Sequence, residues 1–279
     1  MPTASYAGFE DSGRYSSIDV RRLVIRPGAI GDVIVSLPAL EWLRTDYTEI
    51  WVPENVMPLI RFADRVRSIG STGLDLVEFQ QIRFEPFDEV WSWYGGSRPA
   101  FREAVAHLPF RFFPALPPGG TSTHATDFYC TQVGAPLRAT PHIECARGEG
   151  GFLAIQPFSG SPGKNWPLEC FEQVAKRAGI PVQWTAGPEE ALRSAARFDD
   201  LFELAQWLAG ASVYLGNDSG ITHLAAAVGT PVIAIFRATN PEVWAPRGPS
   251  VTVVQDDPKP DEILHLLERL LAGDSPPER

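Results

Sequence analysis

The stretch from Val213 to Phe236 constrains the fold of this chain more than any other. It reads VYLGNDSGITHLAAAVGTPVIAIF: an apolar run, a polar turn, a short helical segment and a second apolar run. Gly229 stands where a helix ends in the left-handed conformation, and Pro231 follows it. Two apolar runs joined through a helix indicate a βαβ unit whose strands are parallel. We therefore expect a parallel α/β sheet.

The turn of this unit gathers polar side chains where open α/β sheets bind ligands, at the carboxyl end of a strand. Backbone N–H groups at the start of the following helix would face an anion. For any one residue alone, ordinary helix capping or a half-buried histidine is the simpler explanation. The whole cluster favours an anion site; its members are Asn217, Asp218, Ser219, Thr222 and His223.

A second strand–turn–helix unit lies near the N-terminus. Residues 23–25 predict a strand, and the glycine-rich turn after it leads into a helix that opens at Asp32. Pro38 is expected to kink this helix or to end its first segment. The Asp32 carboxylate can accept a proton from a substrate hydroxyl, although an Asp at this place is also an ordinary cap. The glycines do not form GxGxxG, so the dinucleotide-binding fingerprint is missing.

Strands and helices alternate along both halves of the sequence. This order predicts an α/β fold of two doubly wound, Rossmann-like domains that face each other across a cleft. The chain, at 279 residues, is long enough for both. We expect a flexible arm over residues 1–20, an abbreviated N-terminal domain over 21–145 and a C-terminal domain over 146–279. Residues 134–150, rich in Gly, Pro and Arg, are the best candidate for the linker.

Composition excludes several classes of protein. The formal net charge of −10 argues against nucleic acid as a partner, because phosphate backbones need clustered Lys and Arg. Three Cys, an odd number without a CxxC pair, support neither a disulfide framework nor a zinc site. The N-terminus lacks the apolar core of a signal peptide. A cytoplasmic protein is expected, with at most peripheral contact at the inner face of the inner membrane, and a monomer.

Two further polar segments follow strands of the C-terminal half. In the loop QPFSGSPGKNWP, Lys164 can reach phosphate oxygens, with Ser159, Gly160 and Ser161 as further donors. Alone, Lys164 would be a solvated loop lysine, but together with the turn at residues 218–220 it could clamp a diphosphate. Gly187 and the residue after it are expected to start an acidic helix, in which Glu190 either binds a ribose diol or is a charge of the first turn.

Four segments resemble glycosyltransferase family 9, the lipopolysaccharide heptosyltransferases: GAIGDVIVSLPALEWLR, SGSPGKNWP, TAGPEE and YLGNDSGITHLAAAVGTPVIAIFRATNPEVWAP. They occur in the order of the family, from about residue 23 to residue 246. The resemblance implies a GT-B fold and inverting transfer without a bound metal or other cofactor. It implies a nucleotide-diphospho-sugar donor, typically ADP-heptose, held by the C-terminal domain. The acceptor, a cell-surface glycan or glycolipid, would lie against the N-terminal domain.

The resemblance also assigns roles to individual residues. Asp32 corresponds to the general base that deprotonates the acceptor hydroxyl, and Lys164 to the lysine on the donor phosphates. Gly31 is expected to contact acceptor or phosphate. Arg237 departs from the family, which commonly has glycine at this place, and could add a phosphate contact or narrow the pocket. The other expected donor-binding residues are Ser159, Gly160, Glu190, Asp218, Ser219, Gly220 and His223.

Two other functions stay open beside a transferase. The region between residues 51 and 150 is short for the family, so a nucleotide-sugar-binding protein of the same fold that has lost transfer is the main alternative. An NAD-dependent enzyme is disfavoured because the GxGxxG fingerprint is missing.

Overall fold

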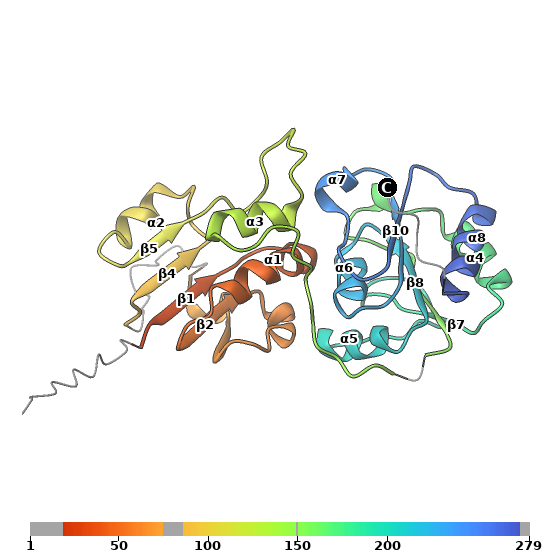
Figure 1. Ribbon diagram of the computed structural model, residues 1–279, viewed down its shortest axis with the longest axis horizontal. Helices are drawn as coiled ribbons and strands as arrows, with labels where there is room; N and C mark the ends of the chain where they lie inside the picture. The colour runs from red at the N-terminus through yellow and green to blue at the C-terminus, as the bar shows by residue number, and fades with distance from the viewer. Residues whose placement is uncertain (1–18, 75–85, 149, 274–279) are drawn as a thin grey trace, which may run out of the picture.

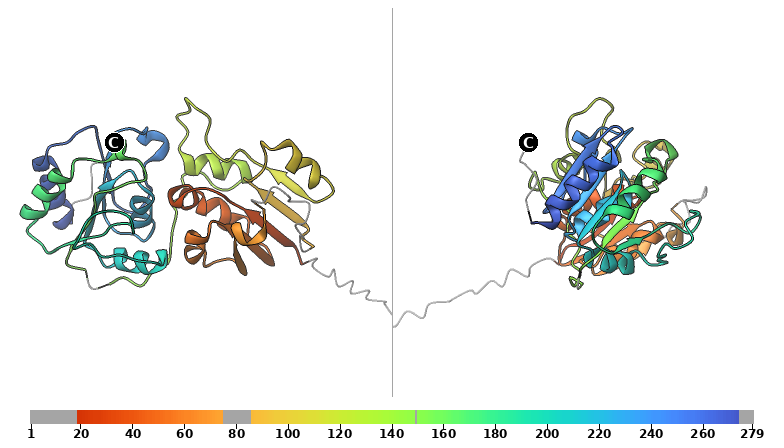
Figure 2. Two further views of the ribbon diagram at one scale, coloured as in Figure 1. Left: turned by 180° about the vertical axis from the view of Figure 1, so that it is seen from behind. Right: turned by 90° about the vertical axis from the view of Figure 1, so that its right-hand side faces the viewer.

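The computed structural model describes residues 19–74, 86–148 and 150–273. It consists of two α/β halves that lie side by side in the front view of Figure 1 and in the rear view of Figure 2. Each half is built on one five-stranded sheet, and every strand pairing in both sheets is parallel. The predicted arm, apart from its last two residues, lies outside the described residues.

The first sheet has the order β3-β2-β1-β4-β5. This order reverses between β1 and β4, so the crevice where such sheets bind ligands lies beyond the carboxyl ends of these two strands. The elements of this half are β1 (Arg21–Ile25), α1 (Ile30–Trp42), β2 (Tyr47–Val52), the 3-10 turns Glu54–Leu59 and Gly70–Thr72, β3 (Arg65–Ser68), β4 (Glu89–Ser92), α2 (Pro99–Ala104), β5 (Phe110–Phe112) and α3 (Ala125–Val133).

The second sheet has the order β10-β9-β8-β6-β7 and reverses between β6 and β8. The predicted fold class, two doubly wound α/β domains, is confirmed, and β8 and β9 pair in parallel as the sequence indicated. The elements of this half are β6 (Leu153–Gln156), the 3-10 turn Pro162–Lys164, α4 (Leu168–Arg177), β7 (Val182–Trp184), α5 (Leu201–Ala209), β8 (Val213–Asn217), α6 (Gly220–Ala227), β9 (Val232–Phe236), α7 (Pro241–Trp244), β10 (Val251–Gln255) and α8 (Pro260–Leu271).

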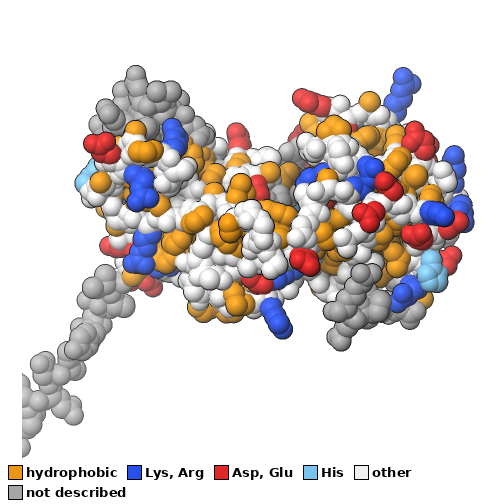
Figure 3. All heavy atoms as spheres, turned by 90° about the horizontal axis from the view of Figure 1, so that it is seen from above, with side chains coloured by type: hydrophobic (Ala, Val, Ile, Leu, Met, Phe, Trp, Pro, Cys, Tyr) orange, Lys and Arg blue, Asp and Glu red, His pale blue; other side chains and the backbone are white. Residues whose placement is uncertain are grey.

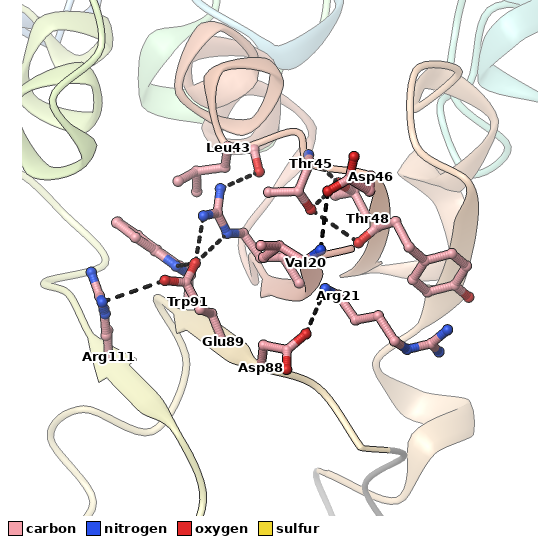
Figure 4. A network of polar contacts seen from close by, with 12 residues as sticks. Val20, Arg21, Leu43, Thr45, Asp46, Thr48, Asp88, Glu89, Trp91 and Arg111 are labelled. Atoms are coloured by element: carbon pink, nitrogen blue, oxygen red, sulfur yellow. Dashed lines mark hydrogen bonds and ion pairs between the residues drawn. The ribbon is translucent and has the colours of Figure 1, made fainter. Parts of the chain in front are cut away.

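Polar contacts fix the amino end of the first sheet, opposite the crevice (Figure 4). The Val20 N–H donates to Asp46 at 3.0 Å, and the Arg21 N–H donates to Asp88 at 2.8 Å. Glu89 accepts from Arg22 Nε at 2.8 Å and from Trp91, so β1 and β4 are tied together by side chains as well as by their ladder. The carboxyl ends of the two strands are thereby held in register.

Helices and an ion pair connect the two halves. Helices α1 and α6 pack together, and their buried residues belong to one apolar cluster that spans both halves. Arg247 of the C-terminal half donates from both Nη atoms to the two carboxylate oxygens of Asp127 on α3, at 2.8 and 2.6 Å. Beside it, His124 Nε2 lies 2.9 Å from the Ala245 carbonyl oxygen. The crevices of the two sheets are therefore held face to face.

Helix α1 runs unbroken through Pro38 to Trp42, so the expectation that Pro38 could end its first segment is wrong. Proline removes one intrahelical hydrogen bond. The buried apolar face on both sides of Pro38, from Val33 to Leu40, outweighs that loss.

The acidic helix expected after Gly187 is also wrong, because these residues form turns. The Glu190 carboxylate accepts the Gly187 N–H at 2.6 Å. The Arg197 guanidinium donates to the carbonyl oxygens of Gly187, Glu190 and Leu192. A side chain that takes these carbonyls replaces the backbone bonds that a helix would have made.

Candidate active site

A cavity of about 490 Å³ lies between the two halves. Segments that follow β1, β5, β6, β8 and β9 line it, so it joins the crevice of the first sheet to that of the second. Its volume suits a small-molecule ligand. The lining residues are Ala29, Gly31, Asp32, Leu116, Gly160, Ser161, Lys164, Asp218, Ser219, Gly220, His223, Thr239 and Trp244.

A buried arginine shapes the turn between β1 and α1. Arg26 is 1% exposed, and its guanidinium donates to Ser36 Oγ at 3.0 Å and to the Asp32 carbonyl oxygen at 2.7 Å. It also lies 4.5 Å from the centroid of the Tyr129 ring. Gly28 has φ +129, and a Cβ there would lie 2.7 Å from the Asp32 Cβ, so only glycine fits. The turn is held tightly from inside, and Asp32 is placed with it.

Asp32 is the third residue of α1 and lines the cavity. One carboxylate oxygen accepts the Ala29 N–H at 2.9 Å, so the capping function considered from the sequence is present, with Ala29 as the N-cap residue. Among the described residues, the other oxygen has no hydrogen-bond partner. The carboxylate is thus fixed through one oxygen and can accept a proton through the other.

The second carboxylate, Asp218, is only 5% exposed. One of its oxygens accepts from Lys164 Nζ at 2.7 Å and from the Thr239 hydroxyl, and the other lies 4.0 Å from His223 Nε2. Ser219 caps α6, because its Oγ accepts the Thr222 N–H at 3.3 Å. All of these groups follow β8 or a neighbouring strand of the same sheet. Asp218 therefore positions Lys164 and Thr239 through one oxygen, while its other oxygen faces His223 at a distance beyond hydrogen bonding.

His223 is 6% exposed, and burial lowers its pKa to about 4. The negative charges of Asp218 and Asp32 oppose this effect, while His124 and Lys164 add to it. The imidazole is consequently neutral at pH 7. Among the lining residues, Lys164 is then the positive charge of the cavity.

The starts of α1 and α6 meet at two glycines. A Cβ on Gly220 would lie 2.8 Å from the Ile30 Cβ and 2.9 Å from the Gly31 nitrogen. A Cβ on Gly31 would lie 3.3 Å from the His223 ring. Two helix N-termini that converge on one cavity, each with a partial positive charge, favour an anionic ligand there.

Five of the residues expected from the sequence lie outside the cavity lining. Asn217 and Thr222 are fully buried: Asn217 Oδ1 accepts the Trp166 N–H at 2.8 Å, and the Thr222 hydroxyl donates to the Asn217 carbonyl oxygen.

The other three are Ser159, Glu190 and Arg237. Ser159 Oγ donates within its own loop, to the Ser161 carbonyl oxygen and to Asn165 Oδ1. Glu190 lies in the turns after β7, where it accepts the Gly187 N–H. Arg237 donates to the Asp257 carboxylate at 2.6 Å and to the Asn165 carbonyl oxygen. The expected residues that do line the cavity together are Gly31, Asp32, Gly160, Ser161, Lys164, Asp218, Ser219, Gly220 and His223.

Sequence reasoning missed several residues of the site. Arg26 precedes the turn in the sequence, but nothing in the pattern shows that a cation would be fully buried there. Thr239 follows β9 directly, and a strand-end rule applied to β9 would have included it. Ala29, Leu116 and Trp244 carry no chemical signal in the sequence.

The described residues contain neither a cluster of metal ligands nor a membrane-spanning helix. Within residues 19–74, 86–148 and 150–273, no group of three or more His, Cys, Asp or Glu side chains could hold a metal ion. Within the same ranges, no helix has the length and apolar character needed to cross a membrane.

The chain is similar to known proteins in sequence and in fold. Residues 132–264, just under half of the chain, match glycosyltransferase family 9 (heptosyltransferase). Lipopolysaccharide heptosyltransferase 3 of Escherichia coli (strain K12) is 27% identical over 165 residues, which are 50% of this chain and 46% of that protein. The match thus spans less than half of this relative's length.

Solved structures resemble the chain over nearly its whole length. A glycosyl transferase family 9 protein from Veillonella parvula DSM 2008 has a TM-score of 0.73 at 19% identity, covering 92% of this chain and 98% of that one. The E. coli ADP-heptose lps heptosyltransferase II has a TM-score of 0.72 at 16% identity, with 91% and 99% covered. E. coli heptosyltransferase WaaC with ADP has a TM-score of 0.66 at 16% identity, with 90% and 100% covered. The predicted GT-B fold and the resemblance to family 9 are confirmed.

Proposed function

We propose that this chain is a glycosyltransferase that moves a sugar from an ADP-linked donor to a hydroxyl of a lipopolysaccharide-type or other cell-surface glycan acceptor. The observation that carries the proposal is the cavity itself. It combines an accessible carboxylate from one half with a lysine and a capped helix N-terminus from the other. Solved relatives of the same fold hold ADP and ADP-2-deoxy-2-fluoro heptose, which supports the choice of donor.

The C-terminal half would bind the donor diphosphate. Lys164 is 30% exposed and is aimed by Asp218, so its ammonium can bind phosphate oxygens without leaving its position. The free N–H groups at the start of α6, after the Ser219 cap, would bind the same anion. As the bond between the sugar and the diphosphate breaks, negative charge develops at this place, and fixed donors stabilise it. Lys164 and the turn amides could carry this role without a metal ion.

The other expected donor contacts are proposals of the same kind. Gly160 and Ser161 line the cavity beside Lys164 and would contact phosphate through backbone and hydroxyl groups. Glu190, at the end of β7, would bind the nucleoside from outside the lining described above. His223, neutral at pH 7, would offer a hydrogen bond to the donor sugar without adding charge.

Asp32 would act as the general base from the N-terminal half. It would take the proton of the acceptor hydroxyl while that oxygen bonds to the anomeric carbon, and the diphosphate would leave with the electron pair of the broken bond. Because the base and the donor site belong to different halves, attack on the face opposite the leaving group is the natural geometry, and the anomeric configuration would invert.

The proposed domain boundary, location and oligomeric state are those expected from the sequence. The N-terminal domain would extend to residue 145 and the C-terminal domain would begin at residue 146, in the segment between α3 and β6. The protein would act in the cytoplasm as a monomer, with at most peripheral contact with the inner membrane.

Nucleotide binding tests the donor site directly. Isothermal titration of the full chain with ADP, UDP, GDP, CDP and dTDP, with and without EDTA, should show selective, EDTA-insensitive binding of ADP. Lys164→Ala should weaken that binding by about 10- to 100-fold, the loss expected for a charged hydrogen bond. Lys176→Ala, an exposed lysine on α4, is the matched control and should bind as the wild type does. If no nucleotide binds, the proposal fails.

Transfer distinguishes an enzyme from a binding protein. The wild-type chain is incubated with ADP-heptose and a panel of lipopolysaccharide core acceptors, and glycosylated product is measured by mass spectrometry. Product that depends on Asp32 supports the transferase. Tight ADP binding without product from any acceptor supports instead the nucleotide-sugar-binding protein.

A further inference from the structure

Two segments, one from each half, meet beside the cavity. The first follows α7, whose last residue, Trp244, lines the cavity. The second is the start of α3 in the N-terminal half, where His124 is the N-cap residue. Figure 1 shows α3 and α7 facing each other across the junction of the halves. A contact between these two segments therefore lies next to the site.

Arg247 makes a two-point contact with Asp127 at this junction. Both carboxylate oxygens accept from the guanidinium, and the two side chains are only 21% and 19% exposed. Arg247 also donates to the Ala139 carbonyl oxygen at 3.2 Å, and Asp127 accepts the Arg138 N–H at 2.7 Å. A bidentate pair fixes an orientation as well as a distance. In the view from above, the middle of the molecule shows mainly hydrophobic and uncharged side chains (Figure 3).

His124 adds a hydrogen bond of fixed direction. Burial lowers the pKa of His124, so the imidazole is neutral at pH 7. Its Nδ1 accepts the Thr126 N–H at 3.1 Å and so carries no proton. The proton is then on Nε2, which donates to the Ala245 carbonyl oxygen at 2.9 Å. Contacts at His124 and at Asp127 thus hold the start of α3 in one orientation to the C-terminal half.

Helix α3 also carries the ring that supports the turn before Asp32. Tyr129 is fully buried, its ring centroid lies 4.5 Å from the Arg26 guanidinium carbon, and its hydroxyl donates to the Ala115 carbonyl oxygen at 2.8 Å. Arg26 donates in turn to the Asp32 carbonyl oxygen at 2.7 Å. Close-packed interiors transmit a displacement, because they have no empty space to absorb it. A shift of α3 would therefore move Asp32.

The packing of α1 against α6 does not replace this contact. Gly31 and Gly220 bring the starts of these helices together, and buried apolar residues surround them. Apolar burial is non-directional, so it brings the halves together without choosing one angle between them. The paired charges supply the direction that the apolar packing lacks.

We infer that Arg247 is a positioning residue for Asp32. By fixing α3 to the C-terminal half, it sets the place of the Asp32 carboxylate relative to the donor held around Lys164. Arg247 itself lies outside the cavity lining, so it acts through α3 and not by contact with a substrate. The inference rests on the proposed function, because it takes Asp32 as the base and Lys164 as the donor contact.

The test compares Arg247→Gln in the wild-type chain and in Asp32→Asn. In the wild-type chain, transfer at saturating ADP-heptose should fall by about 10- to 100-fold, the cost of a misplaced catalytic group, while ADP affinity in titration is unchanged. In Asp32→Asn, the same substitution should cause little further loss, because an absent base cannot be misplaced. A role in stability alone would lower transfer by the same factor in both chains.

Two further variants frame this comparison. Asp127→Asn removes the other partner of the ion pair and should reproduce the pattern of Arg247→Gln. Arg177→Gln is the matched control: its guanidinium donates to Asp261 at 2.6 Å within the C-terminal half, and it lines no part of the cavity. This control should keep full transfer. Thermal unfolding of each variant shows that it is folded.

A second measurement reports on the carboxylate without any transfer. In the full chain with isotope-labelled aspartate, the Cγ resonance of Asp32 is identified by its loss in Asp32→Asn. It should shift or broaden in Arg247→Gln and keep its position in Arg177→Gln.

Equal losses of transfer in the two backgrounds, full transfer by Arg247→Gln, or an unchanged Asp32 resonance in that variant each overturns the inference. Absence of transfer by the wild type overturns the proposed function instead. The Asp32 resonance then still decides whether Arg247 positions this carboxylate.

Discussion

The two strand–turn–helix units that face the active-site cavity differ in what they do with a carboxylate. After β1, Asp32 holds one N–H through one oxygen and leaves the other oxygen open to the cavity. After β8, Asp218 is buried and binds Lys164 and Thr239, with His223 close by. The same local fold thus places a half-buried carboxylate that caps a helix in one half, and a buried carboxylate that pairs with a lysine in the other.

The reason lies in how each turn is supported. The first turn is held by the buried Arg26 guanidinium, which binds backbone carbonyls and leaves the Asp32 side chain outside its network. The second turn is held by Ser219 Oγ, which accepts the Thr222 N–H, and by the Thr222 hydroxyl, which donates to the Asn217 carbonyl oxygen. The two acids therefore differ in their partners: Asp32 accepts one backbone N–H within its own turn, and Asp218 accepts from the side chains of Lys164 and Thr239 outside its turn.

The largest effect should follow from Asp32→Asn. The amide oxygen can still accept the Ala29 N–H, so the helix cap survives while the base is lost. Transfer should fall by about 10²- to 10⁴-fold, with ADP affinity unchanged in titration. Asp46→Asn, which alters another carboxylate on a backbone N–H, should keep full activity. Wild-type turnover by Asp32→Asn would remove Asp32 from the mechanism.

The buried histidine should make stability depend on pH. The pKa of His223 is about 4 in the folded chain and about 6.5 when unfolded, so between these values only the unfolded chain binds the proton. Stability should therefore fall as the pH drops from 6.5 to 4, by at most about 3 kcal/mol. Urea unfolding of His223→Gln should show a shallower decrease than that of the wild type.

The exposed His265→Gln on α8 is the control for this measurement and should follow the wild type. Burial also lowers the pKa of His124, so part of the slope should persist in His223→Gln. Identical pH profiles for His223→Gln and the wild type would contradict the buried, neutral imidazole.

Asp218→Asn sharpens the contrast between the two acids. The substitution removes the negative charge that binds Lys164, and the Asp218 side chain is only 6% exposed. The free energy of unfolding should fall by about 2 kcal/mol, the usual loss for a hydrogen bond to a charged group. Asp32→Asn should leave it nearly unchanged. Equal destabilisation of the two variants in urea would show that the two carboxylates contribute equally to the free energy of unfolding.

The smallest effects concern the glycines where the units touch. Gly220→Ala places a Cβ against backbone and the Ile30 side chain, and should cost about 1–2 kcal/mol through overpacking. A Cβ on Gly31 would meet the His223 ring at 3.3 Å, which can shift slightly, and the Gly220 Cα at 3.5 Å, an ordinary contact, so the cost of Gly31→Ala should be smaller. Thermal unfolding of the pair checks the order, and a reversed order would contradict the described contact.

The sequence predicted the parts of the fold that depend on local pattern. The unit β8–α6–β9 was placed within a residue or two because apolar runs, a capping serine and Gly229 mark its limits. Nine of the expected site residues line one cavity, because the strand-end rule brings together segments far apart in the chain.

What the sequence did not reveal depends on long-range side-chain contacts. The segment after Gly187 has a helical composition, but Arg197, ten residues on, takes its carbonyls. Arg237 was expected at a ligand and binds Asp257 instead. No local pattern indicates that Arg26 is buried. In each case the partners of an arginine side chain depend on the three-dimensional fold.

An ion pair and a close packing contact join the two halves, and these two contacts respond differently to pH and to salt. The hydrogen bond from Arg247 lowers the pKa of Asp127 to about 2, so the ion pair stays formed in moderate acid. Dissolved salt screens charges and weakens it, while the close approach of Gly31 and Gly220 is indifferent to ions. Raising the ionic strength should therefore weaken the ion pair between Asp127 and Arg247 and leave the packing of Gly31 against Gly220 unchanged.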